Sequence, residues 1–191
     1  MMNKAIGWLS AIGLLTFASI TWAAQTVPTM FSGTGHFYQL VFAGSMNFDA
    51  AKAYANSLSF NGVPGHLVSI TSAEEQAFVA SLGVPVSSWI GGFQANTSNE
   101  PAGGWTWIDG EPWSYTNWGV GEPNNANIEN CLHWRSDNAW NDINCGNAYN
   151  GMVVEYDFEN VPIPTLSGWL LGVLTLLLLA GGYTLLRHRQ T

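Results

Sequence analysis

The chain has 191 residues, a formal net charge of −8 and 10 tryptophans. All 13 acidic residues lie between Asp49 and Glu159, and the only basic residues in that stretch are Lys52 and Arg135. Nucleic acid is therefore excluded as an expected partner, because phosphate binding requires positive charge. Carboxylates without basic partners suit a divalent cation, although surface carboxylates usually serve only solubility.

Residues 1–23 have the pattern of an export signal. Lys4 is the only Lys, Arg, Asp or Glu before Asp49, and an apolar run follows it over residues 5–20. Thr21 and Ala23 then place small residues at the exit, as signal cleavage requires. We expect cleavage after Ala23, with an uncut membrane anchor as the alternative.

Near the C-terminus, residues 169–186 carry no charge. At about 1.5 Å per residue they span about 27 Å, close to the bilayer core of about 30 Å. Arg187 and Arg189 follow, and positive charge beyond a span favours the cytoplasmic side. Both ends therefore predict that the intervening domain, residues 24–160, lies outside the cytoplasm.

The segment that leads into this span contains Ile163, Pro164, Thr165 and Leu166. With the span and the basic end, it resembles the IPTL-CTERM sorting signal of Gram-negative bacteria. The resemblance implies processing by an exosortase-like membrane enzyme and transfer toward the cell surface. The simpler alternative is that residues 161–191 form a plain anchor that holds the domain in the periplasm at the inner membrane.

Within the domain, alternating or β-rich patterns predict strands over residues 36–42, 67–70 and 88–93. The paired glycines of the third strand indicate close backbone contact or a bulge. Strand patterns return at residues 131–134 and 152–156.

Two helices are predicted between these strands. A helical period over residues 48–58 places apolar side chains on one face. Ser72 and Glu75 have capping-box spacing at the start of the second helix, which runs to about Leu82 and draws its apolar residues from Ala77, Phe78 and Val79.

Residues 95–130 form a long stretch rich in Gly, Pro, Asn and Trp with little periodicity. Such stretches are uncommon inside compact domains and are often functional. It carries Trp105, Trp107, Trp113 and Trp118, whereas disordered linkers are poor in aromatic residues, so we expect it to pack on itself. The predicted fold class is α+β: two helices beside a small antiparallel sheet, with one long ordered loop.

The chain has two cysteines, Cys131 and Cys145. In an exported protein such a pair predicts one disulfide, and two free thiols are the alternative. The bridge would close a loop of about 15 residues and contribute about 3 kcal/mol on the chain-entropy model.

Oxygen-bearing side chains gather around this cysteine pair. Calcium takes 6–8 oxygen ligands at about 2.3–2.6 Å and mixes carboxylates with neutral carbonyls. Zinc would require Cys or His, yet the cysteines are paired and His133 stands alone. The sequence therefore predicts a calcium site built from three carboxylates and two amides: Glu122, Asn124, Glu129, Asn141 and Asp142.

Residues 36–156 resemble the C-type lectin-like domain family. Residues 89–92 resemble its WIG segment, residues 117–125 its NWxxGEPNN string, and residues 129–131 and 140–145 its remaining calcium-site signatures. The resemblance implies that the same five side chains also bind sugar, with two vicinal hydroxyls replacing water on the calcium. The Glu-Pro-Asn order implies mannose-type sugars, which include glucose, N-acetylglucosamine and fucose.

The chain also departs from the family pattern. Most members have a second disulfide, and its positions here correspond to Ala55 and Val154. An accessory calcium site of some members is weakened by Asn125 and Asn130, where acidic residues would serve better.

Two other functions remain open at this stage. A protein-binding adhesion domain would use calcium only to order the long loop and would use tryptophans such as Trp113 or Trp118 as anchors. A glycosidase would need a free carboxylate pair, whereas the acids here are assigned to a metal. His36, His66 and His133 are scattered in the sequence and are predicted to be structural, so no enzyme is expected.

Overall fold

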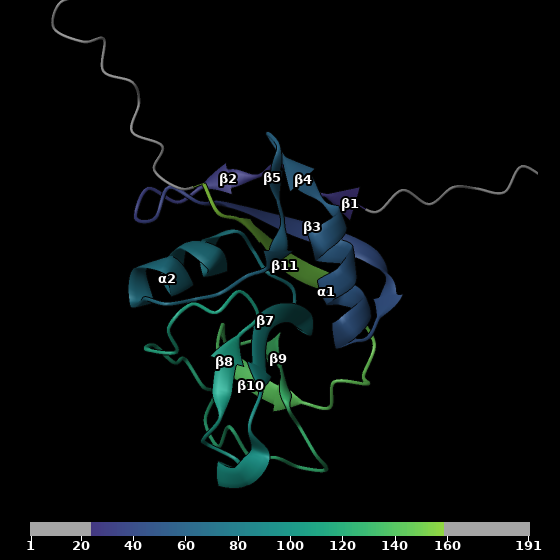
Figure 1. The fold of residues 1–191 in the computed structure, drawn as a ribbon, viewed down its shortest axis with the longest axis vertical. Coiled ribbons are helices and arrows are strands. Elements are labelled where there is room, and N and C mark those ends of the chain that lie inside the picture. The colour runs from purple at the N-terminus through teal and green to yellow at the C-terminus, as the bar shows by residue number, and fades with distance from the viewer. Residues whose placement is uncertain (1–23, 159–191) are drawn as a thin grey trace, which may run out of the picture.

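The structure, a computed structural model, describes residues 24–158 (Figure 1). The predicted export signal, the IPTL motif and the C-terminal hydrophobic span lie outside the described residues. Within residues 24–158, no helix combines the length and the apolar character that a membrane crossing needs.

A nine-stranded sheet runs through the domain, flanked by two helices (Figure 1). Its main path joins six strands in the spatial order β1 (Ala24–Gln25), β3 (Phe37–Met46), β11 (Tyr149–Tyr156), β7 (Ser88–Gln94), β9 (Cys131–Trp134) and β10 (Trp140–Ile143). Three strands pair beside it: β2 (Thr29–Met30) with β3, β6 (His66–Leu67) with β11, and β8 (Trp105–Trp107) with β7. A separate hairpin joins β4 (Ser59–Phe60) to β5 (Val63–Pro64).

The sheet is mixed, so the expectation of a purely antiparallel sheet is wrong. Strands β7 and β11 pair in parallel, with Gly151 opposite Ser88 and Met152 opposite Trp89. Parallel neighbours need a long connection between them. Here that connection is the whole segment from the end of β7 to the start of β11, which contains the long loop and the candidate site.

Helix α1 (Phe48–Ser57) confirms the predicted amphipathic face. Phe48, Ala51 and Ala55 are buried, and the Asn47 side chain caps the helix by accepting a hydrogen bond from the Ala50 N–H at 2.9 Å. An asparagine at this position satisfies an amide that has no partner within the helix.

Helix α2 (Ala73–Ser81) begins as predicted, because the Ser72 hydroxyl accepts a hydrogen bond from the Glu75 N–H at 3.1 Å. Of its three predicted apolar residues, Val79 is buried, Phe78 is partly buried and Ala77 is exposed. The helix also buries Glu75 and Gln76 beside Val79. Glu75 tolerates burial because its carboxylate accepts hydrogen bonds from the Tyr38 hydroxyl at 2.6 Å and the Thr71 N–H at 2.8 Å.

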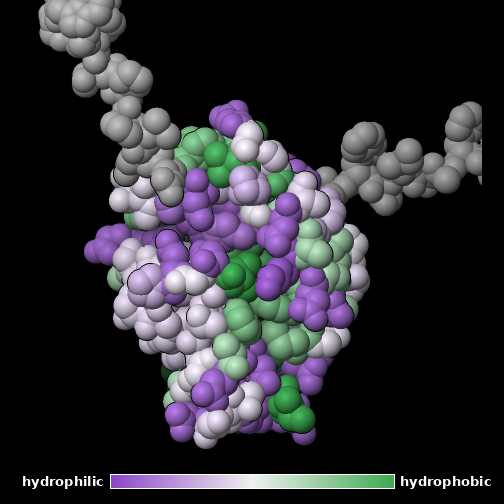
Figure 2. Space-filling view, viewed as in Figure 1, coloured by the Kyte–Doolittle hydropathy of each residue, from purple (hydrophilic) through white to green (hydrophobic). Residues whose placement is uncertain are grey.

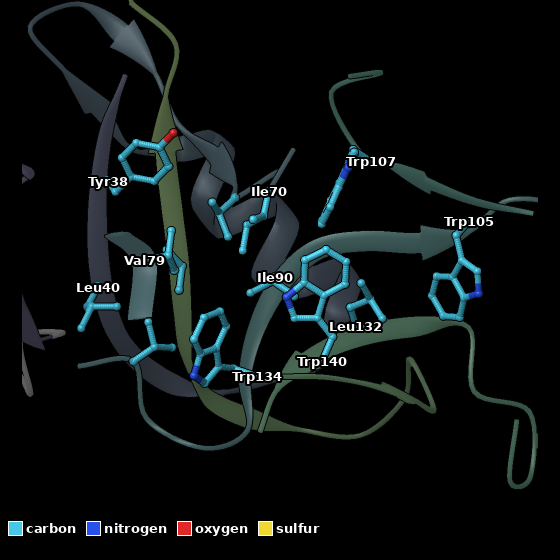
Figure 3. Packing of buried hydrophobic residues seen from close by; sticks show 13 residues of the cluster. Tyr38, Leu40, Ile70, Val79, Ile90, Trp105, Trp107, Leu132, Trp134 and Trp140 are labelled. Atoms are coloured by element: carbon cyan, nitrogen blue, oxygen red, sulfur yellow. The ribbon is translucent and has the colours of Figure 1, made fainter. Parts of the chain in front are cut away.

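The long loop packs on itself through aromatic side chains, as its composition predicts. The Trp113 ring lies 4.7 Å from Trp107 and 5.8 Å from Trp140, and Trp118 lies 5.0 Å from Trp105. Figure 3 shows Trp140 and Trp134 beside Ile90 and Leu132 in the same core. The loop is therefore fixed to the sheet by buried apolar area.

The two positions of the absent second disulfide are filled by a tight apolar contact. Ala55 and Val154 are both fully buried in one cluster. A Cβ added to Gly65 would lie 2.7 Å from Val154 Cγ1 and 3.0 Å from the Ala55 carbonyl, so only glycine fits between them. Close packing takes the place of a covalent bridge at this point.

Candidate functional site

The candidate site is organised around Asp142, in the middle of β10. Its side chain is fully buried, and its two oxygens accept hydrogen bonds from the Asn124 N–H at 3.1 and 3.0 Å. Its Oδ2 also accepts from the Asn125 N–H at 2.7 Å. Charge-assisted bonds of this kind are about twice as strong as neutral ones. They hold the Glu-Pro-Asn turn against the strand.

The side chains of Glu122 and Asn124 contact each other, Asn124 being exposed and Glu122 largely covered. The Asn124 side-chain amide contacts the Glu122 carboxylate, and the Asn124 Oδ1 accepts a hydrogen bond from the Ala126 N–H at 2.8 Å. The peptide bond between Glu122 and Pro123 is cis, which the sequence alone left undetermined.

Glu129 joins the same turn from its other end. Its Oε2 accepts a hydrogen bond from the Ala126 N–H at 2.9 Å, and its own N–H donates to Asn125 Oδ1 at 2.8 Å. Residues 125, 127 and 128 have positive φ values of 50°, 71° and 67°. Two of them are asparagines, which tolerate this conformation well, whereas Ile128 does not.

The cysteine pair ties the remaining ligand candidates to this turn. The predicted disulfide between Cys131 and Cys145 is present, with Cα atoms 5.2 Å apart. It links β9 to the end of β10, where Asn141 precedes Asp142. The Asn141 side-chain amide contacts the Asp142 carbonyl oxygen. A backbone carbonyl near Asp142 therefore lies beside the side chains, as a complete calcium shell would require.

Three carboxylates crowd this site and perturb one another. Burial raises the pKa of Glu122, and the charge of Asp142 adds to that rise, although Arg135 opposes it. Burial also raises the pKa of Glu129; the Ala126 N–H opposes the rise, while the charges of Asp142 and Glu122 add to it. Like charges held this close favour a bound cation.

Arg135 belongs to the site although the sequence analysis did not assign it there. Its Nη1 lies 3.0 Å from Glu122 Oε1, and its Nε lies 3.2 Å from Asp137 Oδ1. A Cβ on Gly119 would lie 2.5 Å from the Arg135 Nε, so that glycine makes room for the guanidinium. Arg135 is one of two Lys or Arg residues between Asp49 and Glu159, and this rarity is the sequence feature that indicates its role.

Hydrogen bonds thus link four of the five predicted ligand residues, Glu122, Asn124, Glu129 and Asp142, through one turn. Asn141 is the neighbour of Asp142 on β10. His133 is separate from them: burial lowers its pKa to about 4, and its ring packs on Tyr149 at 5.3 Å. At the accessory position, the Asn125 side-chain amide contacts the Glu100 carboxylate.

His36 and His66 lie far apart in the sequence, yet both contact acidic residues at the C-terminal end of β11. His36 Nδ1 lies 2.8 Å from Glu155 Oε1, and His66 Nε2 lies 2.9 Å from Asp157 Oδ2. Strand β6 carries His66 and strand β3 directly follows His36, and both strands pair with β11. Long-range pairing of this kind leaves no local sequence pattern.

Hydrogen bonding to Glu155 raises the pKa of His36. Burial lowers the pKa of His66, but the hydrogen bond to Asp157 and the charge of Glu155 outweigh it and raise that pKa to about 9. This second cluster lies apart from the Asp142 site.

A family model and individual known proteins both match this chain to lectins. The family model "Lectin C-type domain" matches residues 44–153. The chain is 37% identical over 102 residues to ladderlectin of Oncorhynchus mykiss, covering 49% of this chain and 52% of that protein. It is 31% identical over 131 residues to the alpha-N-acetylgalactosamine-specific lectin of Patiria pectinifera, covering 63% and 73%.

Among solved structures, the carbohydrate-recognition domain of cow CD23, crystallised in the presence of a GlcNAc2Man3 oligosaccharide, superimposes with a TM-score of 0.56. The identity is 32%, and the alignment covers 65% of this chain and 89% of that one. The family consists of non-enzymatic binding proteins, which agrees with the prediction that this chain is not an enzyme. With the mixed sheet, the two helices and the ordered loop, these matches identify the chain as a member of the C-type lectin domain family.

Proposed function

We propose that this domain binds carbohydrate through a calcium ion held by Glu122, Asn124, Glu129, Asn141 and Asp142. The observation that carries the proposal is the clamp between Asp142 and the Glu-Pro-Asn turn, which gathers these side chains from two distant segments. The donor set contains only oxygens, as a hard cation prefers.

Each residue has a defined task in this proposal. Asp142 is fully buried and already accepts backbone N–H groups, so it anchors the site as well as binding the ion. Asn124 is exposed and contacts Glu122, so this pair forms the end of the site where a ligand would arrive. The Glu122 carboxylate accepts a hydrogen bond from a sugar hydroxyl, and the Asn124 amide donates one to a hydroxyl oxygen. The pair therefore suits a ligand that presents one hydroxyl to each side chain. When bound, calcium supplies a centre on which two vicinal hydroxyls displace water.

We assign the preferred sugars to the mannose type, which includes mannose, glucose, N-acetylglucosamine and fucose. The Glu-Pro-Asn order at residues 122–124 supports this assignment. The CD23 domain was crystallised with a mannose-containing oligosaccharide, whereas the Patiria relative is named for alpha-N-acetylgalactosamine. The chain spans about half the length of ladderlectin. The activity that we assign to this protein as a whole is therefore also part of the proposal.

We also place this domain, residues 24–160, outside the cytoplasm, held at the inner membrane or released to the surface after processing. The support is the charge pattern of the two chain ends and the disulfide, which persists in oxidising compartments. Partners in this setting would be glycans, the membrane and an exosortase-like enzyme.

A protein-binding role is the second candidate, and two exposed apolar residues favour it. Val120 is 96% exposed and Ile128 is 69% exposed, and they flank the Glu-Pro-Asn turn on its two sides. Against this role, Figure 2 shows small apolar patches among hydrophilic residues rather than one broad apolar face. Trp113 and Trp118 are half-buried in the loop's own core, which limits them as anchors.

The test uses the full-length chain in detergent micelles after treatment with a chelator. Calorimetric titration with calcium is followed by mannose, glucose, N-acetylglucosamine and fucose in separate titrations, each with and without calcium. Heat from any of these sugars only in the presence of calcium would support the proposal. Calcium binding with no response to any of the four sugars would favour protein adhesion, and a folded chain that binds no calcium would overturn the site.

A further inference from the structure

A second group of chemically active side chains lies at the end of the domain away from β10. Strand β2 pairs with the start of β3 and occupies the opposite end of the molecule from β10 (Figure 1). His36 comes directly before β3, and Asp157 comes directly after β11. The two strands pair there, with Tyr156 opposite Phe37.

Three ligand atoms from these strands meet at one point. His36 Nδ1 lies 2.8 Å from Glu155 Oε1 and 3.4 Å from Asp157 Oδ1. All three ligand atoms lie within 4.8 Å of one another. Atoms bound to one zinc ion at about 2.0–2.1 Å lie about 3.3 Å apart in a tetrahedral arrangement. The observed separations bracket that value.

The group is held in place before any ion arrives. Glu155 is buried, and its Oε2 accepts a hydrogen bond from the Ser69 N–H at 3.0 Å, so Oε1 faces His36. His66 Nε2 contacts Asp157 Oδ2 at 2.9 Å, and His66 Nδ1 contacts the Leu67 carbonyl at 2.9 Å. His66 thereby fixes Asp157 so that its other oxygen faces the group.

The other oxygen of that carboxylate, Asp157 Oδ1, accepts no hydrogen bond among the described residues. The atom is itself buried and lies 3.4 Å from His36 Nδ1, although the Asp157 side chain as a whole is 41% exposed. A carboxylate oxygen that accepts no hydrogen bond keeps its lone pairs for a cation. A cation coordinated there would satisfy it.

The surroundings offer no other cation. Of the two basic residues within residues 24–158, Lys52 lies over the Phe93 ring at 5.8 Å, and Arg135 pairs with Glu122 and Asp137. Further carboxylates face the group: Glu111 interacts with His36 through its charge, and Asp109 Oδ2 lies 3.8 Å from His66 Nδ1. The region is therefore strongly acidic apart from its two imidazoles.

We propose that His36, Glu155 and Asp157 bind a divalent transition-metal ion of the zinc class, with His66 as a positioning residue. A set of one imidazole and two carboxylates suits such metals, whereas calcium prefers oxygen ligands alone. His66, Asp109 and Asp157 form a similar group, but the Ser69 hydroxyl already donates to Asp109 Oδ2 at 2.6 Å. The orphan oxygen therefore assigns the ion to the His36 side. This site is independent of the calcium proposal.

The experiment is calorimetric titration of the full-length chain in micelles with zinc, in saturating calcium so that the Asp142 site is filled. The variants are H36Q and D157N, and E74Q is the matched control because Glu74 is an exposed acid in α2 outside the cluster. Glutamine at position 36 keeps a hydrogen-bond donor for Glu155 but removes the nitrogen ligand. We expect one zinc per chain, at least tenfold weaker binding in H36Q and D157N, and unchanged binding in E74Q.

A second readout needs no variant. Cobalt added to the wild-type chain should give visible absorption bands of a nitrogen- and oxygen-ligated ion, and zinc should bleach them. Histidine NMR signals should shift with zinc for two of the three histidines in residues 24–158, leaving His133 unchanged. The absence of zinc binding, or equal affinity in wild type and H36Q, would overturn the proposal and leave a hydrogen-bonded ion-pair network only.

Discussion

Asp142 and Asn124 are 18 residues apart in the chain, yet both carboxylate oxygens of Asp142 accept the Asn124 N–H, at 3.1 and 3.0 Å. The same carboxylate also accepts the Asn125 N–H. A single buried acid thus fixes the Glu-Pro-Asn turn and belongs to the proposed ligand set. Asp142 therefore contributes both to the shape of the site and to its charge.

Replacing Asn141 by alanine is expected to abolish calcium and sugar binding together. The substitution removes a neutral oxygen ligand but leaves Asp142 and its backbone contacts in place, so the fold should persist. Calorimetry should show at least a hundredfold loss of calcium affinity. N147A is the matched control, because Asn147 is exposed and lies beyond the cysteine pair. Sugar binding retained by N141A would contradict the proposed mechanism.

Calcium affinity should fall on mild acidification. The pKa values of Glu122 and Glu129 are raised, so protons compete for these ligands at a higher pH than for an ordinary glutamate, whose pKa is about 4.3. Titrations from neutral pH downward should show a steady loss, with a shallower slope in E129Q. A flat affinity over this range would count against both ligands.

The contribution of Glu122 and Glu129 to the stability of the calcium-free domain should increase as the pH falls, whereas calcium affinity decreases. A carboxyl whose pKa is raised in the folded state binds more protons folded than unfolded, so its contribution improves as the pH falls through that window. Chemical unfolding of the wild-type chain and of E129Q, without calcium, measures the contribution of Glu129. If the free energy of unfolding of E129Q changed with pH in the same way as that of the wild type, Glu129 would contribute nothing to the pH dependence of stability.

Removing the Arg135 charge should strengthen calcium binding several-fold. Its guanidinium holds Glu122 Oε1 at 3.0 Å and repels a cation at the same carboxylate. R135Q should therefore bind calcium more tightly at low salt, and the difference should shrink as salt rises. R135K keeps the charge and should resemble wild type. Weaker binding by R135Q would mean that Arg135 serves mainly to position Glu122.

Local sequence patterns predicted the parts of the fold that depend on near neighbours. The face of α1, the Ser72 cap of α2 and strand β9 follow from spacing along the chain, and the disulfide follows from a single cysteine pair. The five proposed ligand residues were assigned from their types and their spacing around that pair, and their binding of calcium stays a prediction.

The features that escaped prediction depend on distant pairing. Strand β10 lies in an Asn-Asp string that suggests a turn, and it becomes a strand only by pairing with β9. The parallel contact of β7 with β11, the ion pair of Arg135 and the meeting of His36 with Asp157 likewise join segments far apart in the chain.

Ile128 offers a stabilising substitution beside the site. It has a φ of 67°, a conformation that costs a residue with a branched Cβ about 1–2 kcal/mol. Its side chain is 69% exposed, so little apolar burial is lost when it is replaced. Asparagine tolerates this conformation, and the Ile128 carbonyl would still accept a hydrogen bond from the Asn144 side chain at 3.1 Å. I128N should raise the free energy of unfolding by about 1 kcal/mol.

The matched control is V120N, because Val120 is more exposed than Ile128 and its φ is not positive. Chemical unfolding of both variants in saturating calcium should show a gain for I128N and no gain for V120N. The gain should also appear without calcium, since it arises from the backbone rather than from the ion. Equal stability of the two variants would show that the Ile128 conformation carries no strain. A gain in I128N accompanied by weaker sugar binding would instead identify the Ile128 side chain as a contact for the ligand.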